Sequence, residues 1–338
     1  MNKRISMIIG LVFLMFLVAC SNDGGSTDGN EEVKSGELKE VSIMLDWFPN
    51  AVHSYLYVAQ EKGYFEEEGI KVDIQFPTNS TDPLNLVAAN KVTLGLYYQP
   101  DVIMARANED VPVKSLASIV RAPLNYTVFM KEKGLETPKD LEGKTVGYPG
   151  IQLNEALLQT IVEHDGGDFS KVEMIDVGFE LNSAIIAENT DAVIGAFINH
   201  EVPVLEQKGY DVDYFNPVDY GVPEYNEIVL ITSDETWKKE QEAIESFWKA
   251  AEKGFHFMKE NPEEALEILL NNQDEANFPL DEEVEKQSLD VLLPKMEDEG
   301  QAFGSQDEET WEEVRDWLLD AGLIDTSPEI GDMIEHLE

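Results

Sequence analysis

The fold is decided by the stretch LDWFPNAVHSYLYVAQEKGYFEEEGIKV, residues 45–72. An apolar run enters this stretch and stops at Pro49, residues 54–62 then have the composition of a helix, and a second apolar run covers residues 71–76. This order predicts a strand, a connecting helix and a second strand of one parallel sheet. An indole, an amide and an imidazole stand at the break after the first strand: Trp47, Asn50 and His53.

The same alternation of strand-like and helix-like segments continues along the chain. A first series predicts strands at residues 41–47, 71–76, 93–98 and 113–120, with helices at 54–62, 83–89 and 101–107. A second series predicts strands at 145–148, 171–177, 192–197 and 212–215, with helices at 152–164, 181–188 and 201–208. After a last strand at 227–232, helices are predicted at 234–259, 262–270, 281–296 and 306–320. The pattern predicts an α/β protein with two mostly parallel sheets flanked by helices.

The two series predict two lobes, the second inserted into the first, because a chain of this length is too long for one small core. In such a protein the ligand cleft is expected between the lobes. The predicted division has a leader at residues 1–19, a flexible tether at 20–39, a first lobe at 40–124, a second lobe at 125–224 and a return to the first lobe at 225–338.

The first residues have the pattern of an export signal. Lys3 and Arg4 precede an apolar run at residues 5–18, and the run ends in LVAC. Small residues before a cysteine at the end of such a run are typical of a lipoprotein signal. Cys20 is the only cysteine, so an internal disulfide is excluded and lipid attachment is its expected role. We therefore expect an extracytoplasmic protein whose lipidated Cys20 anchors it to the outer face of the cell membrane.

The formal charge of -44 restricts the partners of the protein. So acidic a surface repels nucleic acid and anionic lipid, and we expect neither to bind it. The acidic residues are dispersed and the five histidines are scattered, so no metal site is predicted. The sequence has no Walker loop, no GxSxG, no GxGxxG after a strand and no HExxH, so no catalytic residue and no cofactor are predicted. We expect a monomer that binds a small molecule.

Aromatic, amide or acidic side chains follow nearly every predicted strand. Because the carboxyl ends of parallel strands meet at one edge of a sheet, these side chains are expected to face the cleft. Strand alternation places only one of Tyr97 and Tyr98 on that side. Other roles stay open, since Trp47 could cap a core, His53 could cap a helix, and the two acids could be solvated helix starts. The predicted ligand-binding residues are Trp47, Asn50, His53, Tyr97, Tyr98, Gln99, Asn125, Tyr126, Tyr148, Glu180, Asn199, Glu201 and Tyr225.

Four segments carry a resemblance to a known family: residues 45–74, 85–119, 140–150 and 191–212. The opening DW-x-PN-x-x-H with the following A-x-x-KGYF is the specific part, whereas LEGKTVG marks only the wider superfamily. Over about residues 40–232 the chain resembles the thiamine-pyrimidine branch of the type II periplasmic substrate-binding proteins. Within this branch it is most similar to the lipoproteins of ABC importers that salvage N-formyl-4-amino-5-aminomethyl-2-methylpyrimidine.

The resemblance implies two lobes that close on a flat ring, and an ABC permease as the partner. It further implies that the ring stacks on Trp47 and on Tyr97 or Tyr98, while Asn199 and Glu201 read its polar edge. An aminopyrimidine suits such a site, because Trp and Tyr stack on its faces and a carboxylate accepts from its amino group. A sulfonate, nitrate or phosphate would favour arginines, of which the sequence after the leader has few: Arg106, Arg121 and Arg315.

Three alternatives stay open. Another flat heterocycle, hydroxymethylpyrimidine or riboflavin, would suit the same aromatic side chains. A fungal branch with the same opening is enzymatic and consumes pyridoxal phosphate and its own histidine, near which His53 falls. That branch has a cysteine-rich motif and no export signal, whereas this sequence has the signal and lacks the motif. A sensor or scaffold lipoprotein that binds nothing small would need no aromatic cleft.

Overall fold

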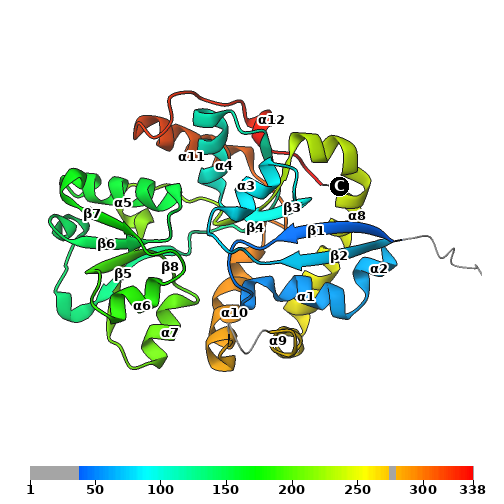
Figure 1. Cartoon of the computed structure of the whole chain (residues 1–338), viewed down its shortest axis with the longest axis horizontal. Coiled ribbons are helices and arrows are strands. Elements are labelled where there is room, and N and C mark those ends of the chain that lie inside the picture. Colours follow the sequence, from blue (N-terminus) through cyan, green and yellow to red (C-terminus); the bar gives the residue numbers. More distant parts are fainter. Residues whose placement is uncertain (1–37, 274–278, 338) are drawn as a thin grey trace, which may run out of the picture. The chain divides into compact units, whose positions relative to one another are not determined.

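The computed structural model describes residues 38–273 and 279–337 (Figure 1). The predicted leader, the predicted lipidation site Cys20 and most of the predicted tether lie outside the described residues. Lys39, the last residue of that predicted tether, is the first residue of strand β1 (Lys39–Met44). The described residues form two mixed α/β lobes, each built on a five-stranded sheet.

The sheet of the first lobe has the strand order β2-β1-β3-β10-β4. β1 is parallel to its neighbours β2 and β3, whereas β10 is antiparallel to both β3 and β4. All six residues of β10 are buried, as expected for an interior strand of a sheet that is covered on both faces. The bounds are β2 (Ile70–Gln75), β3 (Leu94–Tyr97), β4 (Val113–Val120) and β10 (Ile228–Ser233).

The sheet of the second lobe has the strand order β7-β6-β8-β5-β9. β6 is parallel to β7 and β8, and β5 is antiparallel to β8 and β9. The prediction of mostly parallel sheets is therefore confirmed, with β5 and β10 as the reversed strands. The bounds are β5 (Asn125–Met130), β6 (Thr145–Tyr148), β7 (Glu173–Asp176), β8 (Ala192–Phe197) and β9 (Val212–Phe215).

Helices cover both sheets, and each predicted helix is present with its ends within two residues of the predicted positions. The first lobe has α1 (Ser54–Glu61), α2 (Tyr64–Glu67), α3 (Asp82–Ala88), α4 (Gln99–Glu109), α8 (Asp234–Glu260), α9 (Pro262–Asn271), α10 (Glu282–Met296), α11 (Glu308–Asp320) and α12 (Ile330–Met333). The second has α5 (Gln152–His164), α6 (Leu181–Ile186) and α7 (Glu201–Gln207). Short 3-10 turns cover Ala51–His53 (η1), Lys131–Lys133, Pro138–Leu141, Phe169–Lys171 and Pro217–Tyr220.

Local signals in the sequence explain where the C-terminal helices begin and how they pack. Ser233 caps α8 by accepting a hydrogen bond from Thr236 N at 2.9 Å. α8 lies close against α1, since a Cβ on Gly254 would come within 2.2 Å of Tyr55 O. Figure 1 shows α3, α4, α11 and α12 on one face of the first sheet, with α1, α2 and α9 on the other. In the described part of the chain, no helix is long and apolar enough to cross a membrane.

Two segments join the lobes: residues 121–124 after β4 and residues 216–227 before β10. Glu227 links them, because its Oε2 accepts hydrogen bonds from Leu124 N (2.6 Å), Asn125 N (3.0 Å) and the Tyr225 hydroxyl (3.0 Å). Burial raises the pKa of Glu227 to about 7, although these three donors oppose the rise. The two segments are thus fixed to each other beside the pocket. The predicted lobe limits, after residues 124 and 224, stay predictions.

Candidate ligand-binding site

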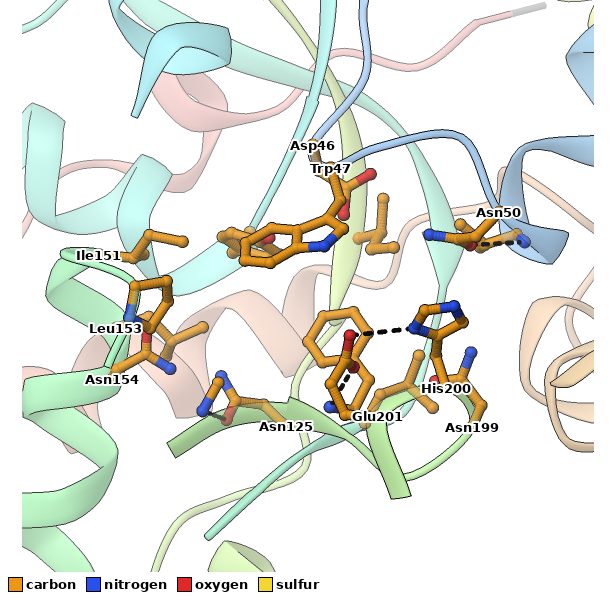
Figure 2. Close-up of a pocket in the computed structure, with 17 residues that line it drawn as sticks. Asp46, Trp47, Asn50, Asn125, Ile151, Leu153, Asn154, Asn199, His200 and Glu201 are labelled. Atoms are coloured by element: carbon orange, nitrogen blue, oxygen red, sulfur yellow. Dashed lines mark hydrogen bonds and ion pairs between the residues drawn. The ribbon is translucent and has the colours of Figure 1, made fainter. Parts of the chain in front are cut away.

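The candidate site is a pocket between the two lobes, lined by seventeen residues (Figure 2). The first lobe contributes Asp46, Trp47, Asn50, Val52, Tyr98 and Ile228. The second contributes three asparagines, Asn125, Asn154 and Asn199, together with Phe197, His200 and Glu201. Figure 2 shows the indole of Trp47 extending into the pocket, with His200 and Glu201 facing it from the other lobe and Asn154 at one end.

The pocket is narrow in this conformation. The cavity that it encloses has a volume of only about 20 Å³. Such a space holds little more than a single water molecule. A ring the size of a pyrimidine therefore enters only if the walls move apart.

The turn after β1 is held by a set of reciprocal hydrogen bonds. The Asn50 side chain accepts from Val52 N at 3.1 Å, and His53 Nδ1 accepts from Asn50 N at 3.1 Å, which makes a capping box at η1. His53 Nε2 lies 2.9 Å from Asp46 Oδ1, and this pair is buried. Trp47 stands between these fixed points, so its backbone is held while its ring reaches the pocket.

Aromatic rings from both lobes meet at the pocket. The rings of Trp47 and Phe179 pack edge to face with centroids 4.5 Å apart, and Phe48 lies 4.6 Å from the same Phe179 ring. Tyr98 and Phe197 also meet edge to face, at 6.4 Å. Because Phe179 and Phe197 belong to the second lobe, ring contacts link the lobes beside the indole.

The structure brings six of the thirteen predicted ligand-binding residues together on the pocket wall: Trp47, Asn50, Tyr98, Asn125, Asn199 and Glu201. Of the two adjacent tyrosines, Tyr98 is the one that faces the pocket, as the alternation allowed, and Tyr97 is fully buried in the first lobe. Their predicted contacts with a ligand stay predictions.

The other predicted residues do not line the pocket, and three of them, His53, Gln99 and Tyr225, support its frame instead. His53 is completely buried, and both ring nitrogens are engaged within the turn. Gln99 Oε1 accepts from Asn226 N at 2.7 Å, which fixes the start of α4 to the segment before β10. The Tyr225 hydroxyl donates to Glu227.

The last three lie outside the pocket wall. Tyr126 packs on Tyr214, with ring centroids 5.2 Å apart, and Glu180 is exposed just before α6. Partial burial and a hydrogen bond with Glu155 raise the pKa of Tyr148 to about 12. Side chains at the end of a strand point to alternating faces, and the sequence alone did not show which of these faced the cleft.

His200, which was not among the predicted residues, holds two carboxylates from different lobes. Its Nδ1 lies 3.0 Å from Glu201 Oε1, and its Nε2 lies 3.3 Å from Glu285 Oε1 of α10. Burial alone would lower the pKa of His200, but the two carboxylates outweigh it and raise this pKa to about 10. At neutral pH the imidazole is therefore a cation, and its charge is already paired. The sequence did offer a signal for His200, because it stands between Asn199 and Glu201, which were both among the predicted residues.

The remaining polar groups on the wall are amides and acids. Glu201 Oε2 accepts from Phe197 N at 2.9 Å, and Asn199 Nδ2 donates to Ser288 Oγ of α10 at 2.8 Å. Asn125 Oδ1 accepts from Gly195 N at 2.8 Å. Among the described residues, no lysine or arginine lines this pocket. The wall therefore lacks a free cationic side chain for an anion.

Polar contacts join the lobes around the pocket. Ser80 Oγ donates to Pro149 O at 2.5 Å, and Leu153 N donates to Asp101 Oδ1 at 3.3 Å. Burial raises the pKa of Asp101 to about 8, with the bond from Leu153 opposing the rise.

Within residues 38–273 and 279–337, no cluster of three His, Cys, Asp or Glu side chains could hold a metal ion. The site can thus enclose a flat, uncharged or weakly basic molecule between aromatic rings, amides and carboxylates.

Solved structures with the same architecture have diverged far in sequence. The alkanesulfonate-binding protein of Xanthomonas axonopodis pv. citri superposes with a TM-score of 0.71 over 89% of this chain and 100% of its own, at 12% identity. At that identity the likeness shows the fold alone, which is the type II periplasmic-binding-protein fold.

Sequence comparison gives nearer relatives. The chain is 53% identical over 316 residues, 94% of its length and 93% of the relative, to the formylaminopyrimidine-binding protein of Halalkalibacterium halodurans. It is 26% identical over 253 residues, 71% of its length and 73% of the relative, to a 4-amino-5-hydroxymethyl-2-methylpyrimidine phosphate synthase of Saccharomyces cerevisiae. The family model described as NMT1/THI5 like matches residues 50–265. The chain therefore belongs to the NMT1/THI5-like family.

Proposed function

We propose that this protein is the extracytoplasmic substrate-binding lipoprotein of an ABC importer, and that it captures N-formyl-4-amino-5-aminomethyl-2-methylpyrimidine for salvage into thiamine biosynthesis. The observation that carries the proposal is the pocket itself, whose wall combines the rings of Trp47 and Tyr98 with amides and carboxylates. The relative named for binding a formylaminopyrimidine supports the choice of ligand.

The chemistry of an aminopyrimidine matches this wall. The ring presents two flat apolar faces, for which Trp47 and Tyr98 supply stacking surfaces. Its edge carries an amino donor beside ring-nitrogen acceptors, and its formamide adds one more donor and one more acceptor. Amide side chains can pair with both donors and acceptors of this ring. A sulfonate or nitrate would instead need charged donors such as arginine, which this wall does not provide.

An enzymatic role as a pyrimidine-forming synthase is less well supported by the site. Pyridoxal phosphate carries a phosphate, and among the described residues the pocket wall offers no lysine or arginine to hold one. The cation that is present, His200, is already paired with Glu201 and Glu285. His53, the residue near the reactive histidine of the fungal branch, is completely buried and bonded through both nitrogens.

A two-lobed protein of this kind can deliver its ligand to a permease by closing its lobes over the ligand. The narrow pocket implies that the lobes separate to admit the ring and close over it, with the closed form presented to the permease as a monomer. The sequence places Cys20 at the end of an export signal, so a lipid on this residue would hold the protein at the outer face of the cell membrane. Cys20→Ser should then release the protein from the membrane fraction without altering ligand binding.

Calorimetric titration tests the proposed ligand. The purified protein is titrated with N-formyl-4-amino-5-aminomethyl-2-methylpyrimidine, hydroxymethylpyrimidine, riboflavin, thiamine, taurine and pyridoxal phosphate under identical conditions. We expect one site per chain and the tightest binding for the formylated aminopyrimidine. Tighter binding of riboflavin would assign another heterocycle, and silence from every pyrimidine would refute the proposal. A Schiff-base absorbance band after addition of pyridoxal phosphate would instead favour the enzymatic role.

A further inference from the structure

Asn154 is a polar side chain on the pocket wall whose hydrogen-bonding groups are both unused. It lies in the first turn of α5, and only 1% of its surface is exposed. Neither Oδ1 nor Nδ2 has a hydrogen-bond partner among residues 38–273 and 279–337. A buried amide without partners is costly, so such a group is normally matched by something that binds beside it.

Other polar side chains around the pocket differ from Asn154 because the protein already uses them. Asn50 donates to Phe48 O and accepts from Val52 N. Asn199 donates through its amide nitrogen to Ser288, and only its Oδ1 is without a partner among the described residues. Glu201 accepts from Phe197 N through one oxygen and pairs with His200 through the other. Asn154 differs from these residues because both its amide nitrogen and its amide oxygen are without a partner among the described residues.

The surroundings hold the Asn154 side chain in place. The preceding residue, Leu153, is tied to Asp101 of the first lobe, and Asn154 N donates to Ile151 O at 3.1 Å. Gly195 makes room for the amide, since a Cβ there would come within 3.2 Å of Asn154 Nδ2 and 2.8 Å of Pro149 Cδ. An amide held this way meets a ligand without first being ordered.

We propose that Asn154 determines specificity for the 4-aminopyrimidine ring, by accepting a hydrogen bond from the 4-amino group through Oδ1 and donating one to the adjacent ring nitrogen through Nδ2. Such a pair of bonds matches the edge geometry with which Asn recognises adenine, where an amino group also stands beside a ring nitrogen. A site built this way rejects a ring that lacks the amino group, because the buried acceptor is then left unpaired. This inference rests on the proposed function and adds the residue that reads the ring.

The test compares two ligands and three proteins by calorimetry. The ligands are the formylated 4-aminopyrimidine and its analogue with hydrogen in place of the 4-amino group. The proteins are the wild type, Asn154→Leu, which keeps the size but removes the amide, and the control Gln152→Leu on the exposed side of the same helical turn. We expect the wild type and the control to bind the amino ligand at least roughly 30-fold more tightly than the analogue. In Asn154→Leu this ratio should fall below about threefold, mainly through loss of affinity for the amino ligand.

The outcomes separate this inference from the proposed function. If the wild type binds neither pyrimidine, the proposed function is refuted and this inference with it. If the wild type discriminates and Asn154→Leu keeps the same ratio, the inference alone is wrong, and equal weakening of both ligands likewise shows a merely structural role. Circular dichroism and thermal melting check folding, and Asn154→Ala, which removes the amide without added bulk, replaces the leucine variant if that one does not fold.

Discussion

Replacing His200 should change how the stability of the protein depends on pH. In the folded state the imidazole lies between Glu201 and Glu285, which raise its pKa from 6.5 to about 10 against the opposing effect of burial. A group whose pKa is raised on folding stabilises the folded state fully below its unfolded pKa, and this contribution is lost as the pH rises through its folded pKa. For His200 the loss therefore occurs between pH 6.5 and about 10.

The magnitude follows from the pKa difference. Each pH unit in that window removes about 1.4 kcal/mol, so the contribution of His200 should fall by about 3 kcal/mol between pH 7.5 and pH 10. We would measure the free energy of unfolding by urea denaturation for the wild type and for His200→Gln at several pH values in this range. The advantage of the wild type should shrink by that amount as the pH rises.

A matched control distinguishes this effect from a general one. His256 is an exposed histidine on α8, and His256→Gln is measured over the same range as the control for loss of a histidine elsewhere in the first lobe. An advantage of the wild type over His200→Gln that stays constant over this range would show that the imidazole is not held charged between the two carboxylates, and the reasoning about this contact between the lobes would be refuted.

Three further substitutions have defined outcomes. Trp47→Ala should weaken binding of the formylated aminopyrimidine by about 2 kcal/mol, roughly 30-fold, because it removes a stacking surface, and calorimetry with unchanged circular dichroism checks this. Asp101→Asn should raise the free energy of unfolding above pH 8, because burial opposes charging of this carboxyl. Urea denaturation at several pH values checks this, and the gain should vanish as the pH falls below about 4. Gly195→Ala should destabilise the fold by at least about 1 kcal/mol and weaken binding, because φ is +101° there and the new Cβ would meet Pro149; unchanged melting would contradict this.

The sequence allowed most secondary structure to be predicted, because its periodic segments are long and well capped. α5 begins and ends at the predicted residues, and α8 begins at the predicted Asp234, directly after its cap Ser233. The strand β5 was missed, because Pro123 and Asn125 give that segment the composition of a loop. It becomes a strand through pairing with β8 and β9, which are distant in the sequence.

The site could be predicted only in part, because the sequence does not reveal which side chains meet across the lobes. Trp47 and Tyr98 were found because aromatic residues at the ends of strands reach such a pocket. His53 looked equally suitable, but Asp46 and the backbone of Asn50 engage its ring inside the turn. The unused amide of Asn154 could be recognised only once its neighbours were known, since nothing local marks it.

A crystal structure of the protein with N-formyl-4-amino-5-aminomethyl-2-methylpyrimidine tests the central claim most directly. The account predicts one pyrimidine ring between the lobes, stacked against Trp47 or Tyr98, with its 4-amino edge at the amide of Asn154. A ring bound elsewhere, or a pocket that stays without ligand at saturating concentration, would contradict the account.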